Sequence, residues 1–295
     1  MKFSLGTWAF SFGPFASAPW PLERVLGYAA EAGFDGVEVN GFRPHAHQDD
    51  LDTGAKCAAL RRQIADYGLG VSGYAPSITH SPAQVATKDY VAEIAKCLFV
   101  CENLGTPILR VDSVDPPEAL APDTYAERVD QLVATWRAAA LQAAKAGVVI
   151  VWEFEPGFWL NKPSEVLRVV QAVDSEHFRV LFDSSHAYMG AVIGARQTGD
   201  IETLPGGVTA YAEMLGDAIG HLHLIDSDGS LHDNETSTHT PFGEGEIDFS
   251  AVLSAIRPIV SRLEWWCADF CFCAETESAG RRAVPFMRGL AEEVL

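Results

Sequence analysis

Short apolar runs and longer amphipathic segments alternate along the chain. The apolar runs predict strands buried on both faces, at residues 2–10, 36–41, 69–74, 108–112, 148–155, 179–183, 219–225 and 264–270. The segments between them have helical spacing, at 22–32, 54–67, 88–104, 123–146, from about 163, 207–215, 249–260 and 279–295. Several of these segments end directly before a glycine, as helices with a glycine C-cap do. Eight strand–helix units without a linker predict an α/β fold, a single-domain (β/α)8 TIM barrel over residues 1–295.

Four successive apolar runs end in side chains that bind metals. They carry Glu153 and Glu155, Asp183, His221 and His223, and Asp269, in chain order. An acid at the end of a buried strand is costly unless a cation or a hydrogen-bonding partner meets it. The chemistry of (β/α)8 barrels lies at the C-terminal ends of their strands. The pattern therefore predicts a divalent metal site and an active site at that end.

The donor atoms indicate which metals suit this site. Three carboxylates and one imidazole favour Mn2+ or Mg2+, and also admit Co2+, Fe2+ or Zn2+. Glu153 and Glu155 are two residues apart and share one face of their strand, so either is a candidate ligand. For the run at 219–225 we expect the second histidine, His223, to face inward.

Charge and hydropathy exclude several other classes of protein. Hydrophobic residues make up 48% of the 295 residues, yet no apolar run approaches the roughly 18 residues of a membrane span. The net charge of −19 argues against nucleic-acid binding, which needs a basic surface. The N-terminal residues lack the apolar core and cleavage site of a signal peptide. We expect a cytoplasmic protein with no nucleic-acid or membrane partner.

The six cysteines do not have the spacing of a standard zinc site. Cys97 and Cys101 are four apart in a predicted helix, as buried small hydrophobes would be. Cys267, Cys271 and Cys273 match neither a zinc finger nor a zinc ribbon. Reduced thiols are expected in a cytosolic chain.

Five short motifs give the chain a recognisable resemblance. They are FDGVE at 34–38, WEFEPG at 152–157, LFDSSH at 181–186, GHLH at 220–223 and PFGEGEID at 241–248. With them the chain resembles the xylose isomerase-like barrel superfamily of sugar isomerases and epimerases. This superfamily includes ketose 3-epimerases, hydroxypyruvate isomerase and inosose dehydratase.

The resemblance implies one divalent cation held by Glu153, Asp183, His223 and Asp269. Glu153 is preferred to Glu155 because the family pattern Glu-x-x-Pro-Gly fits residues 153–157, and Glu155 is then expected to face the substrate. Asp269 stands where the family has a glutamate that also acts as a base. This shorter side chain is a departure from the pattern.

The resemblance further implies an isomerase or epimerase of a small sugar, ketose or inosose, acting through a metal-stabilised enediolate. Glu153 and Asp269 are the expected bases. His186, in the motif Asp-x-x-His, is expected to bind a substrate oxygen or move a proton. The other expected substrate-binding residues are Glu155, Arg110, Trp8, Tyr74 and Glu38.

Further features of the sequence limit the substrate. The loop after residue 225 is rich in acids and would repel a phosphate, so we expect an unphosphorylated sugar. No lysine lies at a predicted strand end, which argues against a Schiff-base aldolase. Four histidines lie in predicted loops on the active face: His45, His47, His232 and His239. A surface position is expected for each, with a place in the pocket open for one or two of them.

Two alternative functions stay open. A metal-dependent lyase would expel water from an inosose, or a β-substituent from a 3-keto glycoside, through the same enediolate. A non-catalytic sugar-binding barrel would keep the pocket without turnover, and the shorter Asp269 favours it. In each case the expected partner is a small sugar or polyol, and a homo-oligomer is compatible with the sequence. The superfamily's DNA-repair endonucleases need three zinc ions and a basic face, which this sequence does not predict.

Overall fold

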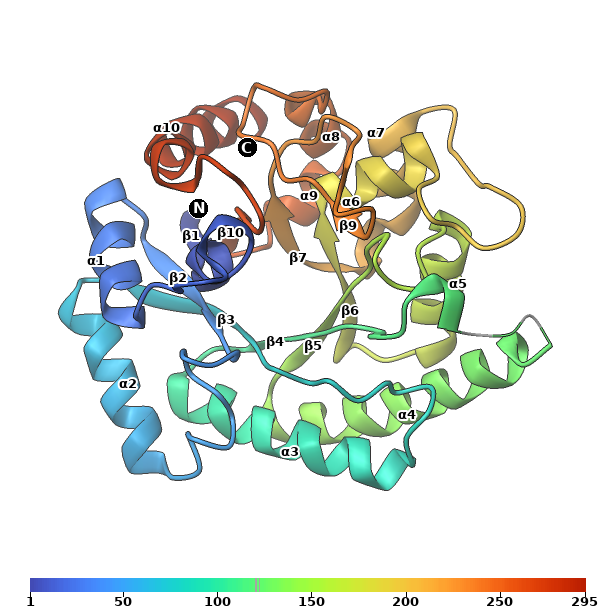
Figure 1. Ribbon diagram of the computed structural model, residues 1–295, viewed down its shortest axis with the longest axis horizontal. Helices are drawn as coiled ribbons and strands as arrows, with labels where there is room; N and C mark the ends of the chain where they lie inside the picture. The colour runs from blue at the N-terminus through green and yellow to red at the C-terminus, as the bar shows by residue number, and fades with distance from the viewer. Residues whose placement is uncertain (120, 122) are drawn as a thin grey trace.

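The computed structural model describes residues 1–119, 121 and 123–295. In this part of the chain, eight parallel strands close into a barrel with helices around it (Figure 1). The strands are β1 (Lys2–Gly6), β2 (Gly36–Asn40), β3 (Gly70–Ala75), β4 (Ile108–Val111), β5 (Val149–Glu153), β6 (Phe178–Asp183), β7 (Ile219–Leu224) and β10 (Trp265–Ala268). Their order around the barrel is β1-β10-β7-β6-β5-β4-β3-β2. The predicted (β/α)8 barrel is confirmed.

The main helices follow the strands in chain order. They are α1 (Leu22–Ala32), α2 (Gly54–Asp66), α3 (Thr87–Leu104), α4 (Tyr125–Ala146), α5 (Pro163–Val173), α6 (Ser184–Tyr188), α7 (Gly207–Leu215), α8 (Phe249–Ala255), α9 (Arg257–Val260) and α10 (Thr276–Val294). Gly33, Gly105 and Gly147 cap α1, α3 and α4 in the left-handed conformation. Within the described residues, no helix has both the length and the apolarity of a membrane span.

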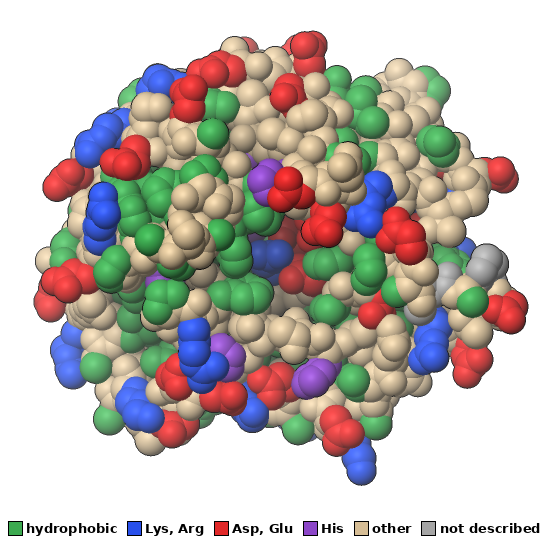
Figure 2. Space-filling model, in the orientation of Figure 1, with side chains coloured by type: hydrophobic (Ala, Val, Ile, Leu, Met, Phe, Trp, Pro, Cys, Tyr) green, Lys and Arg blue, Asp and Glu red, His purple; other side chains and the backbone are tan. Residues whose placement is uncertain are grey.

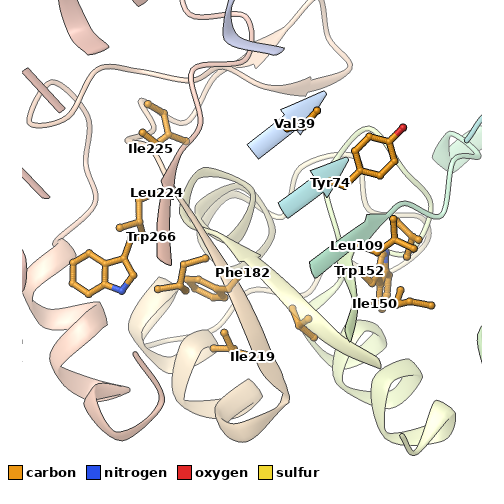
Figure 3. Packing of buried hydrophobic residues seen from close by; sticks show 14 of the residues in the cluster. Val39, Tyr74, Leu109, Ile150, Trp152, Phe182, Ile219, Leu224, Ile225 and Trp266 are labelled. Carbon is orange, nitrogen blue, oxygen red and sulfur yellow. The ribbon is translucent and has the colours of Figure 1, made fainter. Parts of the chain in front are cut away.

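The core lies between the outer face of the barrel and the helices. Because side chains alternate along a strand, β5 directs Ile150 and Trp152 outward while Glu153 points into the barrel. Figure 3 shows Ile150 and Trp152 with Leu109 and Phe182, which belong to the same buried hydrophobic cluster. Trp136 of α4 meets Trp152 with ring centroids 4.9 Å apart, and both rings are fully buried.

Three local differences from the predicted elements have physical reasons. The expected strand 2–10 ends at Gly6, and Thr7–Phe10 forms a 3-10 turn that carries Trp8 over the barrel end. The expected helix 249–260 is two helices, because Pro258 lacks the amide that would continue the first. The long loop after β7 contains an unpredicted hairpin, β8 (Leu231–His232) with β9 (Thr236–Ser237), whose strands are too short to show a periodic pattern.

The packing of Trp136 gives a test of this core. Replacing Trp136 by alanine removes a fully buried indole and leaves a cavity between α4 and the barrel. We expect the free energy of unfolding to fall by about 3–5 kcal/mol, measured by urea denaturation. The control is Leu141→Ala on the same helix, where the side chain is 63% exposed; we expect a change within about 0.5 kcal/mol. Equal losses in the two variants would contradict this description of the core.

Candidate active site

Four side chains that the sequence predicts as metal ligands converge at one end of the barrel. Glu153, Asp183 and His223 lie at the C-terminal ends of β5, β6 and β7, and Asp269 directly follows β10. Each offers a ligand atom, and these four atoms lie within 4.8 Å of one another. All four side chains are buried. Parallel strands place their ends on one rim, so residues more than a hundred positions apart meet here.

The donor atoms of this four-residue group fit a hard divalent cation. His223 Nδ1 lies 2.8 Å from Glu153 Oε1 and 3.3 Å from Asp269 Oδ2. Asp183 Oδ1 accepts a hydrogen bond from the backbone amide of His186, whereas its buried Oδ2 has no hydrogen-bond partner among the described residues. An unpartnered buried carboxylate oxygen is costly. A cation within reach of all four groups would remove that cost, and oxygen-rich sites suit Mg2+ or Mn2+.

Trp8 and the backbone after β10 fix the orientation of Asp269. The Trp8 indole N–H donates to Asp269 Oδ1 at 2.8 Å, and the Cys271 amide donates to the same oxygen at 2.8 Å. The Trp8 ring passes so close to Gly6 that a Cβ at Gly6 would lie 2.3 Å from it. Only a glycine at position 6 leaves room for this arrangement. With Oδ1 occupied, Asp269 presents Oδ2 to the four-residue group.

Glu38 lies beneath the site and orients His223. Glu38 Oε2 is 2.7 Å from His221 Nε2 and 3.2 Å from His223 Nε2. Burial alone would raise the pKa of Glu38, but the charges of His223 and His221 hold it below its usual range. An ionised Glu38 holds a proton of His223 on Nε2, so the proton that His223 would lose on metal binding leaves from Nδ1 and frees that atom for the metal. A carboxylate behind a ligating histidine is a recurrent feature of metal sites.

A cavity of about 450 Å³ opens above the four-residue group. Figure 2 shows it as a hollow near the middle of this face, with basic and acidic side chains at its bottom. The charged and titratable residues of its described lining are Arg110, Asp112, Glu153, Glu155, His186, Arg196, Glu235, His239, Asp269 and Cys271. Cavities of this size commonly enclose small-molecule ligands.

Glu155 and His186 face this cavity without belonging to the four-residue group. Glu155 accepts a hydrogen bond from the Thr236 hydroxyl, and its Oε2 lies 3.8 Å from His186 Nε2. Burial, with the charges of Asp112 and Glu153, raises the pKa of Glu155 to about 8. His186 Nδ1 lies 2.8 Å from Ser237 Oγ. Burial lowers the pKa of His186 to about 3, so its imidazole is neutral near pH 7.

Cationic side chains offset part of the buried negative charge. Arg110 Nη2 lies 2.6 Å from Glu153 Oε2 and 3.1 Å from Asp112 Oδ1. His239 Nδ1 lies 3.3 Å from Asp269 Oδ1. Burial alone would lower the pKa of His239, but Asp269, with help from Asp183, raises it to about 9. Burial and the charges of Asp269 and Glu153 raise the pKa of Asp183 to about 7. The nearby cations therefore offset the buried negative charge only in part.

Several expected residues lie elsewhere than the sequence predicts. Tyr74 is buried outside the barrel end, where its hydroxyl donates to the Ala46 carbonyl, and Glu38 lies below the cavity. Neither Tyr74 nor Glu38 is among the described residues that line the cavity, so neither side chain is placed to contact a substrate there. Trp8 and Arg110 do line the cavity. Among the loop histidines, His239 lines the cavity, the alternative left open for one or two of them. His45 is buried against the Trp20 carbonyl rather than at the surface.

Comparisons with known proteins agree with this fold. The chain is 26% identical to the fructoselysine 3-epimerase of Escherichia coli O157:H7 over 253 residues, which cover 82% of each protein. It resembles the structure of a D-tagatose 3-epimerase-like protein with a TM-score of 0.72 and 20% identity, over 100% of both chains. It also resembles a D-psicose 3-epimerase determined in the presence of D-fructose, with a TM-score of 0.74 and 17% identity, over 98% and 99% of the two chains.

A family model described as the xylose isomerase-like TIM barrel matches residues 26–288. The matched range includes all four residues of the four-residue group. With the epimerase relatives, this match identifies an enzyme of the sugar isomerase and epimerase type. The chain belongs to the xylose isomerase-like TIM barrel family.

Proposed function

We propose that this protein is a divalent-metal-dependent epimerase or isomerase of a small unphosphorylated ketose or inosose. The observation that carries the proposal is the buried group of Glu153, Asp183, His223 and Asp269, with ligand atoms within 4.8 Å of one another at the bottom of a cavity. Further support comes from the curated relatives, which are named fructoselysine 3-epimerases. That name favours inversion at a carbon next to a ketone carbonyl.

In this proposal the four-residue group holds one Mn2+ or Mg2+ ion. A divalent cation there supplies Lewis acidity, which polarises a carbonyl and makes the neighbouring carbon-bound proton easier to remove. The protein's part is to keep the four ligands oriented, through Trp8 and Cys271 for Asp269 and through Glu38 for His223. Arg110 lies against Glu153 and limits its freedom in the same way.

Proton transfer requires a carboxylate that reaches the cavity and is not already occupied. Glu153 has His223 on one oxygen and Arg110 on the other, and Asp269 Oδ1 accepts two hydrogen bonds. Hydrogen bonds to a carboxylate stabilise its charged form and weaken it as a base. Glu155 is the least constrained of the three, and its raised pKa makes it the strongest base among them once it has lost its own proton. We therefore assign the first proton transfer to Glu155 and keep Glu153 and Asp269 mainly as ligands.

His186 has a separate part in the proposed reaction. Its Nδ1 faces Ser237 Oγ, which leaves Nε2 directed toward Glu155 and the cavity. A neutral imidazole held in this way can donate to, or accept from, a substrate hydroxyl. We propose that His186 positions the substrate beside Glu155.

Deuterium exchange tests the proposed function. The Mn2+-loaded enzyme is incubated in heavy water with D-fructose, D-tagatose and D-psicose, and recovered sugars are analysed by NMR. We expect deuterium at the carbon next to the carbonyl of the sugar that turns over. Glu155→Gln should lower the exchange rate at least about 100-fold, because a general acid–base group contributes that much, while the bound metal stays at one ion per chain.

Two further variants make the exchange test specific. The Glu153→Gln variant should lose both the bound metal and the deuterium exchange, because the substitution removes a negatively charged ligand. Glu264→Gln makes the same chemical change at an exposed position before β10 and should leave both unchanged. Turnover without deuterium in substrate or product would contradict enolisation. Metal loss in Glu155→Gln rather than Glu153→Gln would reverse the assignment of the two glutamates.

Metal affinity tests the position of Glu38 behind His223. Glu38→Gln keeps the shape of the side chain but removes the charge that orients His223. We expect the dissociation constant for Mn2+ to rise about 10–100-fold, measured by titration calorimetry with Glu264→Gln as control. Affinity should also fall as the pH is lowered through 7, because protons compete for Asp183, whose pKa lies at about 7 in the metal-free protein. Unchanged affinity in Glu38→Gln, or affinity independent of pH, would contradict the assigned ligands.

A further inference from the structure

Four phenylalanines line the cavity beside its charged bottom. Phe12, Phe42, Phe158 and Phe272, here called the aromatic rim, are each partly exposed and belong to the cavity lining. Figure 2 shows hydrophobic side chains around the central hollow. Partly exposed phenylalanines that gather in one cavity commonly mark a ligand-binding surface.

The aromatic rim comes from two opposite sides of the barrel. Phe12 and Phe42 follow β1 and β2, Phe272 follows β10, and these three strands are neighbours in the barrel. The ring centroid of Phe12 lies 5.6 Å from that of Phe42 and 5.9 Å from that of Phe272. Phe158 follows β5, four strands away from β1 around the barrel. Apolar walls on both sides suit a ligand with an apolar part.

The backbone holds Phe272 in its position. Phe272 has a φ of 59°, in the left-handed region that side chains other than glycine rarely adopt. A Cβ on Gly13 would lie 2.9 Å from the Phe272 Cα, so the β1 loop packs directly against this residue. The His232 ring stacks on the Phe272 ring with centroids 4.3 Å apart. Unusual backbone conformations that the surrounding structure enforces occur preferentially at functional sites.

Both arginines of the described cavity lining are already paired, which limits the charge of any apolar ligand part. Arg196 donates to both carboxylate oxygens of Glu118 and to the Glu235 carbonyl. Arg110 lies against Glu153 and Asp112. An anionic substituent would therefore meet acids without a free guanidinium to bind it. A neutral substituent avoids this repulsion.

We propose that the substrate is a sugar that carries a neutral aromatic substituent, which binds against the aromatic rim while the sugar lies over the four-residue group. This inference rests on the proposed function, because the reacting sugar is assigned to the metal-binding end. The aromatic rim then selects a conjugated sugar over a free ketose. Ring-to-ring contact adds to the gain from burying apolar area.

A matched pair of ligands tests this inference. The probes are 6-O-benzyl-D-fructose and 6-O-methyl-D-fructose, which differ only in the aromatic ring and place it far from the carbonyl. Their dissociation constants for the Mn2+-loaded enzyme are measured by titration calorimetry. We expect the benzyl ether to bind at least tenfold more tightly than the methyl ether. In Phe272→Ala and Phe272→Leu this ratio should fall below threefold; the leucine variant keeps apolar volume in case alanine disturbs the loop.

Control measurements keep the two proposals separate. Ile201→Ala, at an exposed hydrophobic position outside the cavity lining, should keep the wild-type ratio. Equal affinities, no measurable binding of either ether, or a high ratio that persists in both Phe272 variants would overturn the inference. Deuterium exchange into the two ethers and into D-fructose, D-tagatose and D-psicose, measured with the same enzyme, reports on the proposed function independently. Deuterium exchange without tighter binding of the benzyl ether would contradict only the proposed aromatic substituent. Tighter binding of the benzyl ether without exchange would contradict only the proposed reaction.

Discussion

The structure depends on how buried negative charge is balanced at one end of the barrel. Glu153, Asp183 and Asp269 are buried within reach of one another, and such charges are costly unless paired. His223, with a pKa raised well above its usual range despite burial, and the protonated His239 supply part of the compensation. The pKa of Asp183 is raised, and its Oδ2 has no hydrogen-bond partner in the part of the chain that the structure describes, which indicates that these side chains do not complete the compensation. A divalent cation would complete the balance.

The residues around the four-residue group act on it directly or from further out in the cavity. Trp8 and Glu38 touch the ligands Asp269 and His223 and fix which atoms these present. Glu155 lies outside the four-residue group and faces the cavity, where we propose that it exchanges protons. The aromatic rim lies at the same cavity, where we propose that apolar contact selects the substituent. In this proposal, metal binding, proton transfer and selection are assigned to separate residues within one barrel end.

The fold and the convergence of Glu153, Asp183, His223 and Asp269 could be predicted because both follow from local sequence patterns. Apolar runs mark the strands, and a polar residue at the end of each run marks the site. The contacts of Trp8, Glu38 and His239 could not be predicted, since each depends on a partner that is distant in the sequence. The position of Tyr74 also differs from the expected one, because alternation along β3 directs its side chain outward, where the hydroxyl donates to the Ala46 carbonyl.

The most direct test of the account is the position of the metal. Crystals soaked in Mn2+ are measured at a wavelength where manganese scatters anomalously. The account predicts one peak per chain, within about 2.0–2.3 Å of His223 Nδ1 and of carboxylate oxygens from Glu153, Asp183 and Asp269. It also predicts that Glu155 lies outside the coordination sphere. A peak bound by Glu155 instead of Glu153, or no peak at these four residues under saturating Mn2+, would contradict it.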